Sequence, residues 1–180
     1  MREPATAGFV MALIVPEDRG PGLWTTIECT HPADRSVIIE SILVDGTDLD
    51  VLDDVADTLV EKLIGWKRWE ATFVWRKTIE AWPIVDGDLT SRGVDITAIP
   101  PARATNTAYS WWRQNLGRDE QAWKKFTRDM TREPRRILER EASKPMDPAV
   151  FGQLQALTAR KPKPATAVPE STITMPDHVS

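Results

Sequence analysis

The sequence predicts a mainly α-helical protein, with a small N-terminal β element and a disordered or extended C-terminal tail. Apolar residues recur at spacings of three and four across residues 48–160, as on one face of a helix. The first 47 residues hold short β-branched runs instead. Residues 161–180 are rich in Pro, Ser and Thr and poor in aromatics. We therefore expect an N-terminal β element or arm over 1–47, a helical domain over 48–160 and a Pro-rich flexible tail over 161–180.

Three N-terminal segments are expected to be strands. They are Phe9–Val15, Leu23–Cys29 and Val37–Val44, and turn material such as Pro16–Pro21 separates them. Three strands are marginally stable alone, so the sequence also predicts a helix or a neighbouring chain that covers them.

A long, tryptophan-rich helix is expected to begin at Asp48 and to end at Pro83. Aspartates crowd its first turn, where carboxylates cap free amides and favour the positive end of the helix dipole. Its apolar stripe changes sides near residue 71, so the helix either breaks near Gly65 or has two different apolar surroundings. The residues Asp86–Gly87–Asp88 are expected to form a turn.

The second apolar face of this helix is a candidate interface with another polypeptide. Trp75, Ile79 and Trp82 lie on it, beyond the change of stripe. Trp111 and Trp112, near the end of the next predicted helix, are further candidates. The alternative is that both faces are internal, because aromatic stripes are commonly part of a core.

Local signals predict the ends of the remaining helices. Pro100–Pro101 begins one helix and Gly117 ends it. Asp119 caps the next helix, which ends before Pro134. A short basic piece follows, and then a capped segment with one apolar face. The basic piece is Arg135–Ala142; the segment begins at Asp147–Pro148, and its apolar residues are Val150, Phe151, Leu154 and Leu157.

Charge is distributed unevenly along the chain, whose net charge is −4. Residues 1–100 hold 9 Lys and Arg against 18 Asp and Glu, whereas residues 101–180 hold 14 against 9. The two parts therefore carry −9 and +5. Opposite charges favour contact between the two parts, within a chain or between copies.

The stretch from Arg113 to Lys144 is the candidate surface for nucleic acid. It carries ten basic and six acidic residues around Trp123 and Phe126, and a basic helix with aromatic residues can bind phosphates and stack on bases. The interspersed acids and the acidic net charge make nucleic acid an unlikely partner, and a nucleic-acid-binding accessory protein stays an alternative. The basic side chains concerned are Arg113, Lys124, Lys125, Arg128, Arg135 and Arg136.

We expect no catalytic residue, no metal and no cofactor, and therefore no enzyme. Cys29 and His31 would share a strand face, but no third group orients them, so a Cys-dependent enzyme is only a remote alternative. The acidic run 45–50 lacks the ligand spacing of a calcium loop, and helix capping explains it. The apolar run Phe9–Val15 is too short to cross a membrane, so no membrane partner is expected.

Two segments carry a resemblance to a known family. Residues 87–112 contain the turn Gly93-Val-Asp and the pair Ile99-Pro, followed by a predicted helix that ends in two tryptophans. Residues 119–126 are the acidic-capped start of another predicted helix, with spaced aromatic residues. This pattern, within residues 65–135, resembles small proteins from the virion-assembly region of tailed phages that infect actinobacteria.

The resemblance implies a non-enzymatic structural role in the tail or head-to-tail region, or that of a transient tail assembly chaperone. The implied partners are other virion or assembly proteins, with self-association as a further option. The implied location is the host cytoplasm during assembly, with the virion as the alternative.

Overall fold

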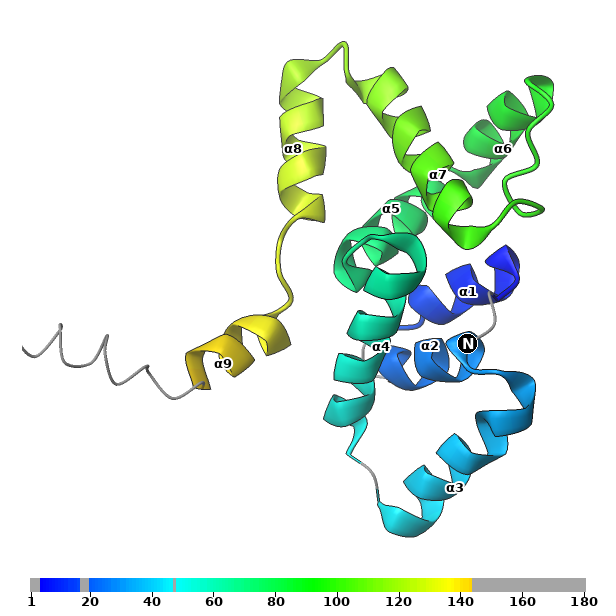
Figure 1. Cartoon of the computed structure of the whole chain (residues 1–180). Coiled ribbons are helices and arrows are strands. Elements are labelled where there is room, and N and C mark those ends of the chain that lie inside the picture. The colour runs from blue at the N-terminus through cyan, green and yellow to red at the C-terminus, as the bar shows by residue number, and fades with distance from the viewer. Residues whose placement is uncertain (1–3, 17–19, 47, 144–180) are drawn as a thin grey trace, which may run out of the picture. The chain divides into compact units, whose positions relative to one another are not determined.

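The computed structural model describes residues 4–16, 20–46 and 48–143, and every regular element in them is helical (Figure 1). The mainly α fold class is therefore confirmed. The elements are α1 (Thr6–Leu13), α2 (Pro21–Cys29), the 3-10 turn η2 (Pro32–Asp34), α3 (Arg35–Asp45), α4 (Leu49–Ile64), α5 (Arg68–Glu80), α6 (Trp82–Ser91), α7 (Pro101–Leu116), α8 (Glu120–Met130) and α9 (Arg135–Ser143).

The chain divides into two units, residues 1–137 and 138–180, and the packing described below lies within the first. The predicted tail 161–180 and the apolar segment that begins at Asp147 lie outside the described residues.

The prediction of N-terminal strands is wrong, because no described residue lies in a strand. Leu23–Cys29 and Val37–Val44 lie in α2 and α3, and Phe9–Val15 covers the second half of α1 and the two residues after it. Helix α1 packs against α2, α5 and α7, and α2 packs against α4. Phe9 and Cys29 are almost fully buried in these contacts. Burial of this kind outweighs the β propensity of single residues.

The predicted long helix breaks into three, as its change of apolar stripe allowed. Gly65 follows α4 with a φ of 75°, a left-handed conformation that suits a residue without Cβ. Helix α5 then begins at Arg68. Pro83 lies in the first turn of α6 rather than at the end of a helix, and Asp86–Gly87–Asp88 is part of α6. The break near Gly65 is thus confirmed, and the turn at 86–88 is wrong.

The predicted ends of α7 and α8 are confirmed. Pro101 occupies the first turn of α7, and the helix ends at Leu116, before Gly117. The Asp119 carboxylate accepts hydrogen bonds from the backbone N–H groups of Gln121 and Ala122, each at 3.0 Å. These bonds satisfy two of the free donors at the start of α8.

Buried threonines connect two tryptophans to the helices of the core. The indole N–H of Trp75 donates to the Thr105 hydroxyl at 3.0 Å, and that hydroxyl donates to the Pro101 carbonyl at 2.8 Å. In the same way Trp112 donates to Thr78 at 3.1 Å. Each indole therefore buries its ring with its donor satisfied, which links α5 to α7.

A cluster of ion pairs joins α4 to α5. Arg68 is only 6% exposed, and its guanidinium binds Asp53 and, at 2.6 Å, Asp57. Arg136 makes a second ion pair with Asp57, at 2.8 Å. Helix α2 meets α4 at Gly22, where a Cβ would lie 2.6 Å from the Cα of Asp53, so this crossing requires glycine.

A series of aromatic rings runs between α5, α7 and α8. Neighbouring ring centroids lie 5.0 to 5.7 Å apart, which is the usual range for aromatic pairs. In order the rings are Trp66, Tyr109, Trp123, Phe126, Trp112 and Trp111, and Phe73 also packs on Phe126.

Candidate interaction surface

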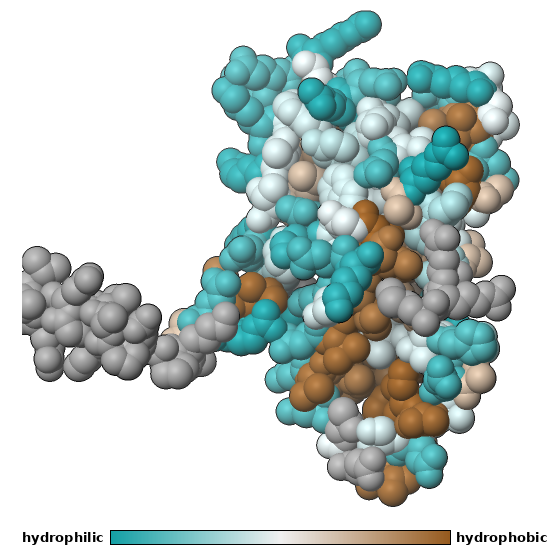
Figure 2. Space-filling view, viewed as in Figure 1, coloured by the Kyte–Doolittle hydropathy of each residue, from teal (hydrophilic) through white to brown (hydrophobic). Residues whose placement is uncertain are grey.

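Exposed apolar side chains gather on α3 and the first two turns of α4. Figure 2 shows hydrophobic side chains spread over these two helices on the face drawn. We call this set the α3–α4 apolar surface; its exposed fractions are Val37 64%, Ile39 43%, Leu43 79%, Val44 74%, Leu49 49%, Val51 53% and Val55 40%. Large exposed apolar patches commonly mark sites of protein contact.

Helix α3 is the unusual part of this surface, because none of its described side chains is buried. It packs chiefly against the short turn η2 before it. Its apolar residues do not form one stripe: Val37, Ile38 and Ile39 are consecutive and so point to different sides. A helix that is apolar on several sides is normally covered by other elements.

Acidic side chains border the α3–α4 apolar surface. Glu40 on α3 and Asp48, Asp50 and Asp54 at the start of α4 are all exposed. Asp48 also caps α4 through a 3.1 Å bond from the backbone N–H of Asp50, which confirms the expected capping role of this residue. The surface therefore offers apolar contact within a negative border.

The predicted tryptophan interface is largely internal. Trp75 is 1% exposed and Trp111 is 7% exposed, so neither can be the contact site of a partner, and their assignment to an interface is wrong. Trp111 donates to the Asp88 carboxylate at 2.7 Å. Trp82 and Trp112 are half-buried against the core, and only Ile79, 40% exposed, faces solvent substantially.

The physical reason is that different neighbours cover the two apolar faces. Helix α5 contacts α1, α7 and α8 as well as the helices before and after it, so both of its apolar sides meet other parts of the chain. The change of stripe near residue 71 reflects this internal packing. The alternative stated for these aromatics, that both faces are internal, therefore describes Trp75 correctly.

The predicted basic surface is partly neutralised. Arg113, Lys124, Lys125, Arg128 and Arg135 are exposed on α7, α8 and α9. The Lys124 ammonium pairs with Glu120 at 2.7 Å, and the Arg128 guanidinium pairs with Asp129 at 3.4 Å. Paired acids of this kind reduce the attraction of a helix for phosphates.

Arg136 does not belong to that exposed surface. It is half-buried, and its guanidinium lies 2.8 Å from the Asp57 carboxylate. Its inclusion among the candidate nucleic-acid residues is therefore corrected, because this cation already has a partner within the fold.

Cys29 and His31 do not form a nucleophile and base pair. Cys29 is 1% exposed at the end of α2, and burial, together with the nearby Glu28 charge, raises the pKa of its thiol to about 11. The reactive species is the thiolate, which is scarce at neutral pH with such a pKa. The Nδ1 of His31 accepts a hydrogen bond from the backbone N–H of Ala33 at 3.3 Å, so the ring caps η2.

Cys29 should react slowly with a thiol reagent in the folded protein at about pH 8, and rapidly once urea unfolds the chain.

The raised pKa of the Cys29 thiol also makes the stability of the protein depend on pH. This pKa lies above the ordinary 9.0, so the stability gained by keeping the thiol protonated is complete below pH 9 and is lost as the pH rises to about 11. Urea unfolding across this range measures the loss. Cys29→Ala, the control, should lack this part of the pH dependence, and equal dependence in both proteins would contradict the assignment.

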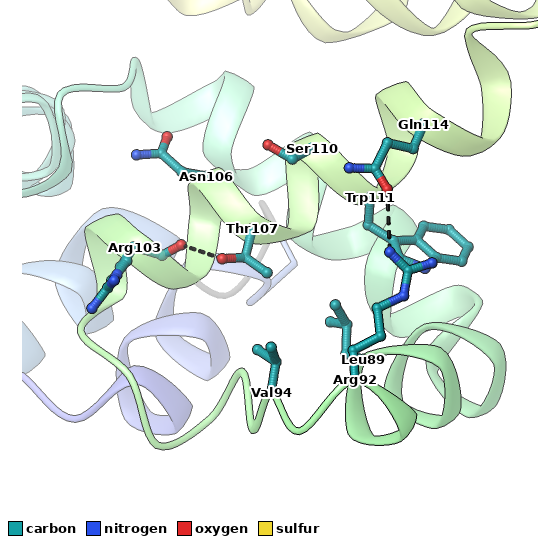
Figure 3. Close-up of a pocket in the computed structure, with 9 residues that line it drawn as sticks. All are labelled: Leu89, Arg92, Val94, Arg103, Asn106, Thr107, Ser110, Trp111 and Gln114. Carbon is teal, nitrogen blue, oxygen red and sulfur yellow. Dashed lines mark hydrogen bonds between the residues drawn. The ribbon is translucent and has the colours of Figure 1, made fainter.

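A small pocket of about 300 Å³ lies between α6 and α7 (Figure 3). Its rim groups bond to one another: Arg92 donates to Gln114 at 3.3 Å, and Thr107 donates to the Arg103 carbonyl at 2.8 Å. None of its lining residues is Asp, Glu, His or Cys, so the lining supplies no ordinary general acid or base. The lining residues are Leu89, Arg92, Val94, Arg103, Asn106, Thr107, Ser110, Trp111 and Gln114.

Among the residues that the structure describes, no three of His, Cys, Asp and Glu come together in a way that could hold a metal ion. In the same ranges, no helix combines the length and the apolar character that a membrane span needs.

The chain matches no family model, no curated protein and no solved structure.

Proposed function

We propose that this chain is a non-enzymatic structural or assembly protein of a tailed phage that works through protein contacts, in the tail or head-to-tail region. The observation that supports the protein-contact role most directly is the α3–α4 apolar surface. Four of its side chains, Val37, Leu43, Val44 and Val51, are each more than half exposed. The resemblance of residues 87–126 to phage virion-assembly proteins supplies the phage setting.

The contact is expected to be energetically useful because exposed apolar area leaves water when a partner covers it. Burial of a Leu or Val side chain contributes about 1.5–3 kcal/mol. Interfaces commonly concentrate their binding energy in a few well-packed residues near their centre.

The proposal is tested by complementation of a phage that lacks this gene. A plasmid copy with Leu43→Asp and Val44→Asp should yield far fewer infective particles than the wild-type copy, because two carboxylates within the apolar surface prevent its burial. Ile84→Asp is the matched control: Ile84 is 68% exposed on α6, outside the α3–α4 apolar surface, and this variant should complement fully.

The same particles distinguish two forms of the proposal. Mass spectrometry of purified virions that finds the chain in stoichiometric amount indicates a structural protein, and its absence indicates a transient tail assembly chaperone. Normal particle yield from the Leu43→Asp/Val44→Asp copy would contradict the role of the surface. Normal yield without any copy of the gene would contradict the assembly function itself.

A further inference from the structure

We propose that the α3–α4 apolar surface of one copy binds residues 144–163 of a second copy. This inference rests on the proposed function, and it names the partner of the surface described above.

We expect a partner to cover the surface because α3 obtains little stabilising packing from its own chain. No described side chain of α3 is buried, and α3 is only 11 residues long. Isolated helices of this length are marginal in water, and most helical stability in proteins comes from the packing of an apolar face. A cover over Leu43 and Val44, which are 79% and 74% exposed, would supply that packing.

Residues 144–163 combine the two properties that the surface demands. Their apolar residues Val150, Phe151, Leu154 and Leu157 have the spacing that predicts one face of a helix. Basic residues flank this apolar set, namely Lys144 before it and Arg160, Lys161 and Lys163 after it. An amphipathic helix laid into an apolar surface is a common mode of recognition.

Charge complementarity favours this occupant. The surface is bordered by exposed acids, among them Glu40, Asp48 and Asp50. The occupant carries four basic residues against the single acid Asp147. Opposite charges at the rim of an interface steer encounter and fix the orientation of the partners.

Two other contacts between copies fit less well. A symmetric contact between two α3–α4 apolar surfaces would bring like charges together, since both borders are acidic. A contact with α8 would offer the wrong chemistry, because Phe126 and Met130 of α8 are buried in its own core. The exposed side of α8 carries charged residues such as Lys124 and Lys125, so it offers no apolar stripe to match the surface.

The contact joins two different regions of the chain, so it is heterologous. Each copy carries both the α3–α4 apolar surface and the segment 144–163 that binds it. Heterologous contacts link copies head to tail and form rings when the rotation closes, or open filaments when it does not. A copy in which either the surface or the segment is disabled can bind only one neighbour, so the assembly stops at that copy.

The test uses three full-length chains and analytical ultracentrifugation. The wild-type chain should sediment as species larger than a monomer. A surface variant, Leu43→Asp/Val44→Asp, and a segment variant, Phe151→Asp/Leu154→Asp, should each remain monomeric, with association at least about tenfold weaker. Ile84→Asp, on the exposed side of α6, should associate like the wild type. Circular dichroism and the melting temperature check that each variant is folded.

The decisive measurement is a one-to-one mixture of the two monomeric variants. The intact segment of the surface variant should bind the intact surface of the segment variant, so the mixture should form a dimer that does not grow further. A mixture that stays monomeric would overturn the proposal, and so would a segment variant that still associates.

A wild-type chain that is monomeric up to high concentration would also overturn the proposal. It would leave the proposed function standing if the complementation experiment still shows that Leu43→Asp/Val44→Asp blocks particle formation. The surface would then bind a different protein. Failure of the proposed function has a separate signature, which is normal particle yield without the gene.

Discussion

Trp75→Ala should lower the free energy of unfolding by about 3–5 kcal/mol, the usual loss when a large aromatic side chain is removed from a core. Trp75 is 1% exposed on α5, and its indole N–H donates to Thr105 of α7. The variant removes both the ring and the hydrogen bond. Urea unfolding followed by circular dichroism measures the loss.

Two variants make this prediction specific. Ile79→Ala, one turn further along α5, should cost much less, because Ile79 is 40% exposed. Trp75→Phe keeps much of the aromatic ring but loses the hydrogen-bond donor to Thr105. Its loss of unfolding free energy should therefore lie between the losses of Ile79→Ala and Trp75→Ala. A stable, monomeric Trp75→Ala protein that fails only to bind a partner would restore the interface interpretation of this residue.

Arg68→Ala should cost a similar amount, about 3–5 kcal/mol, because it removes the most buried cation of the cluster. Asp53 then loses this ion pair, and Asp57 keeps its pair with Arg136. The Arg68 side chain is 7% exposed, whereas those of Asp53 and Asp57 are 20% and 16% exposed. Solvent therefore screens this cluster poorly. Urea unfolding at neutral pH measures the effect.

The neighbouring residue supplies a matched control. Lys67 pairs with Glu61 at 2.7 Å, but these side chains are 47% and 53% exposed. Lys67→Ala should therefore cost far less stability than Arg68→Ala. Arg68→Ala and Asp57→Ala should also be non-additive, since each removes part of one cluster. Equal losses for Arg68→Ala and Lys67→Ala would show that burial adds nothing to the Arg68 pairs.

The helices whose ends are marked by local signals could be predicted from the sequence. Pro101 and Gly117 bracket α7, and Asp119 caps α8 with two backbone hydrogen bonds. Gly65 marks the break between α4 and α5 for a similar reason, since only its own backbone conformation is involved. Such signals act within a few residues and do not depend on the rest of the fold.

The N-terminal helices could not be predicted in that way. Val37–Val44 is rich in β-branched residues, and its helical state is not visible in single-residue propensity. The burial of Trp75 also depends on distant residues, because Thr105, its hydrogen-bond partner, lies 30 positions away. A pattern within one helix reports which sides are apolar, but not which neighbour covers each side.

The α3–α4 apolar surface was missed for the same reason. As a strand, Val37–Val44 would place alternate residues on one covered face; as a helix, it presents apolar residues to several sides. The signal that points to this surface is a run of six apolar residues among eight, interrupted only by Glu40 and Ser41. Such a run fits neither an exposed amphipathic helix nor a half-exposed strand.

The series of aromatic rings between α7 and α8 gives the protein an intrinsic optical reporter. Two ring pairs join the two helices: Trp112 of α7 stacks on Phe126 of α8 with centroids 5.6 Å apart, and Tyr109 lies 5.7 Å from Trp123. Aromatic rings this close couple their electronic transitions, so near-ultraviolet circular dichroism should carry a strong signal from this region. Movement of α8 away from α7 would change that signal while the far-ultraviolet helical spectrum stayed constant.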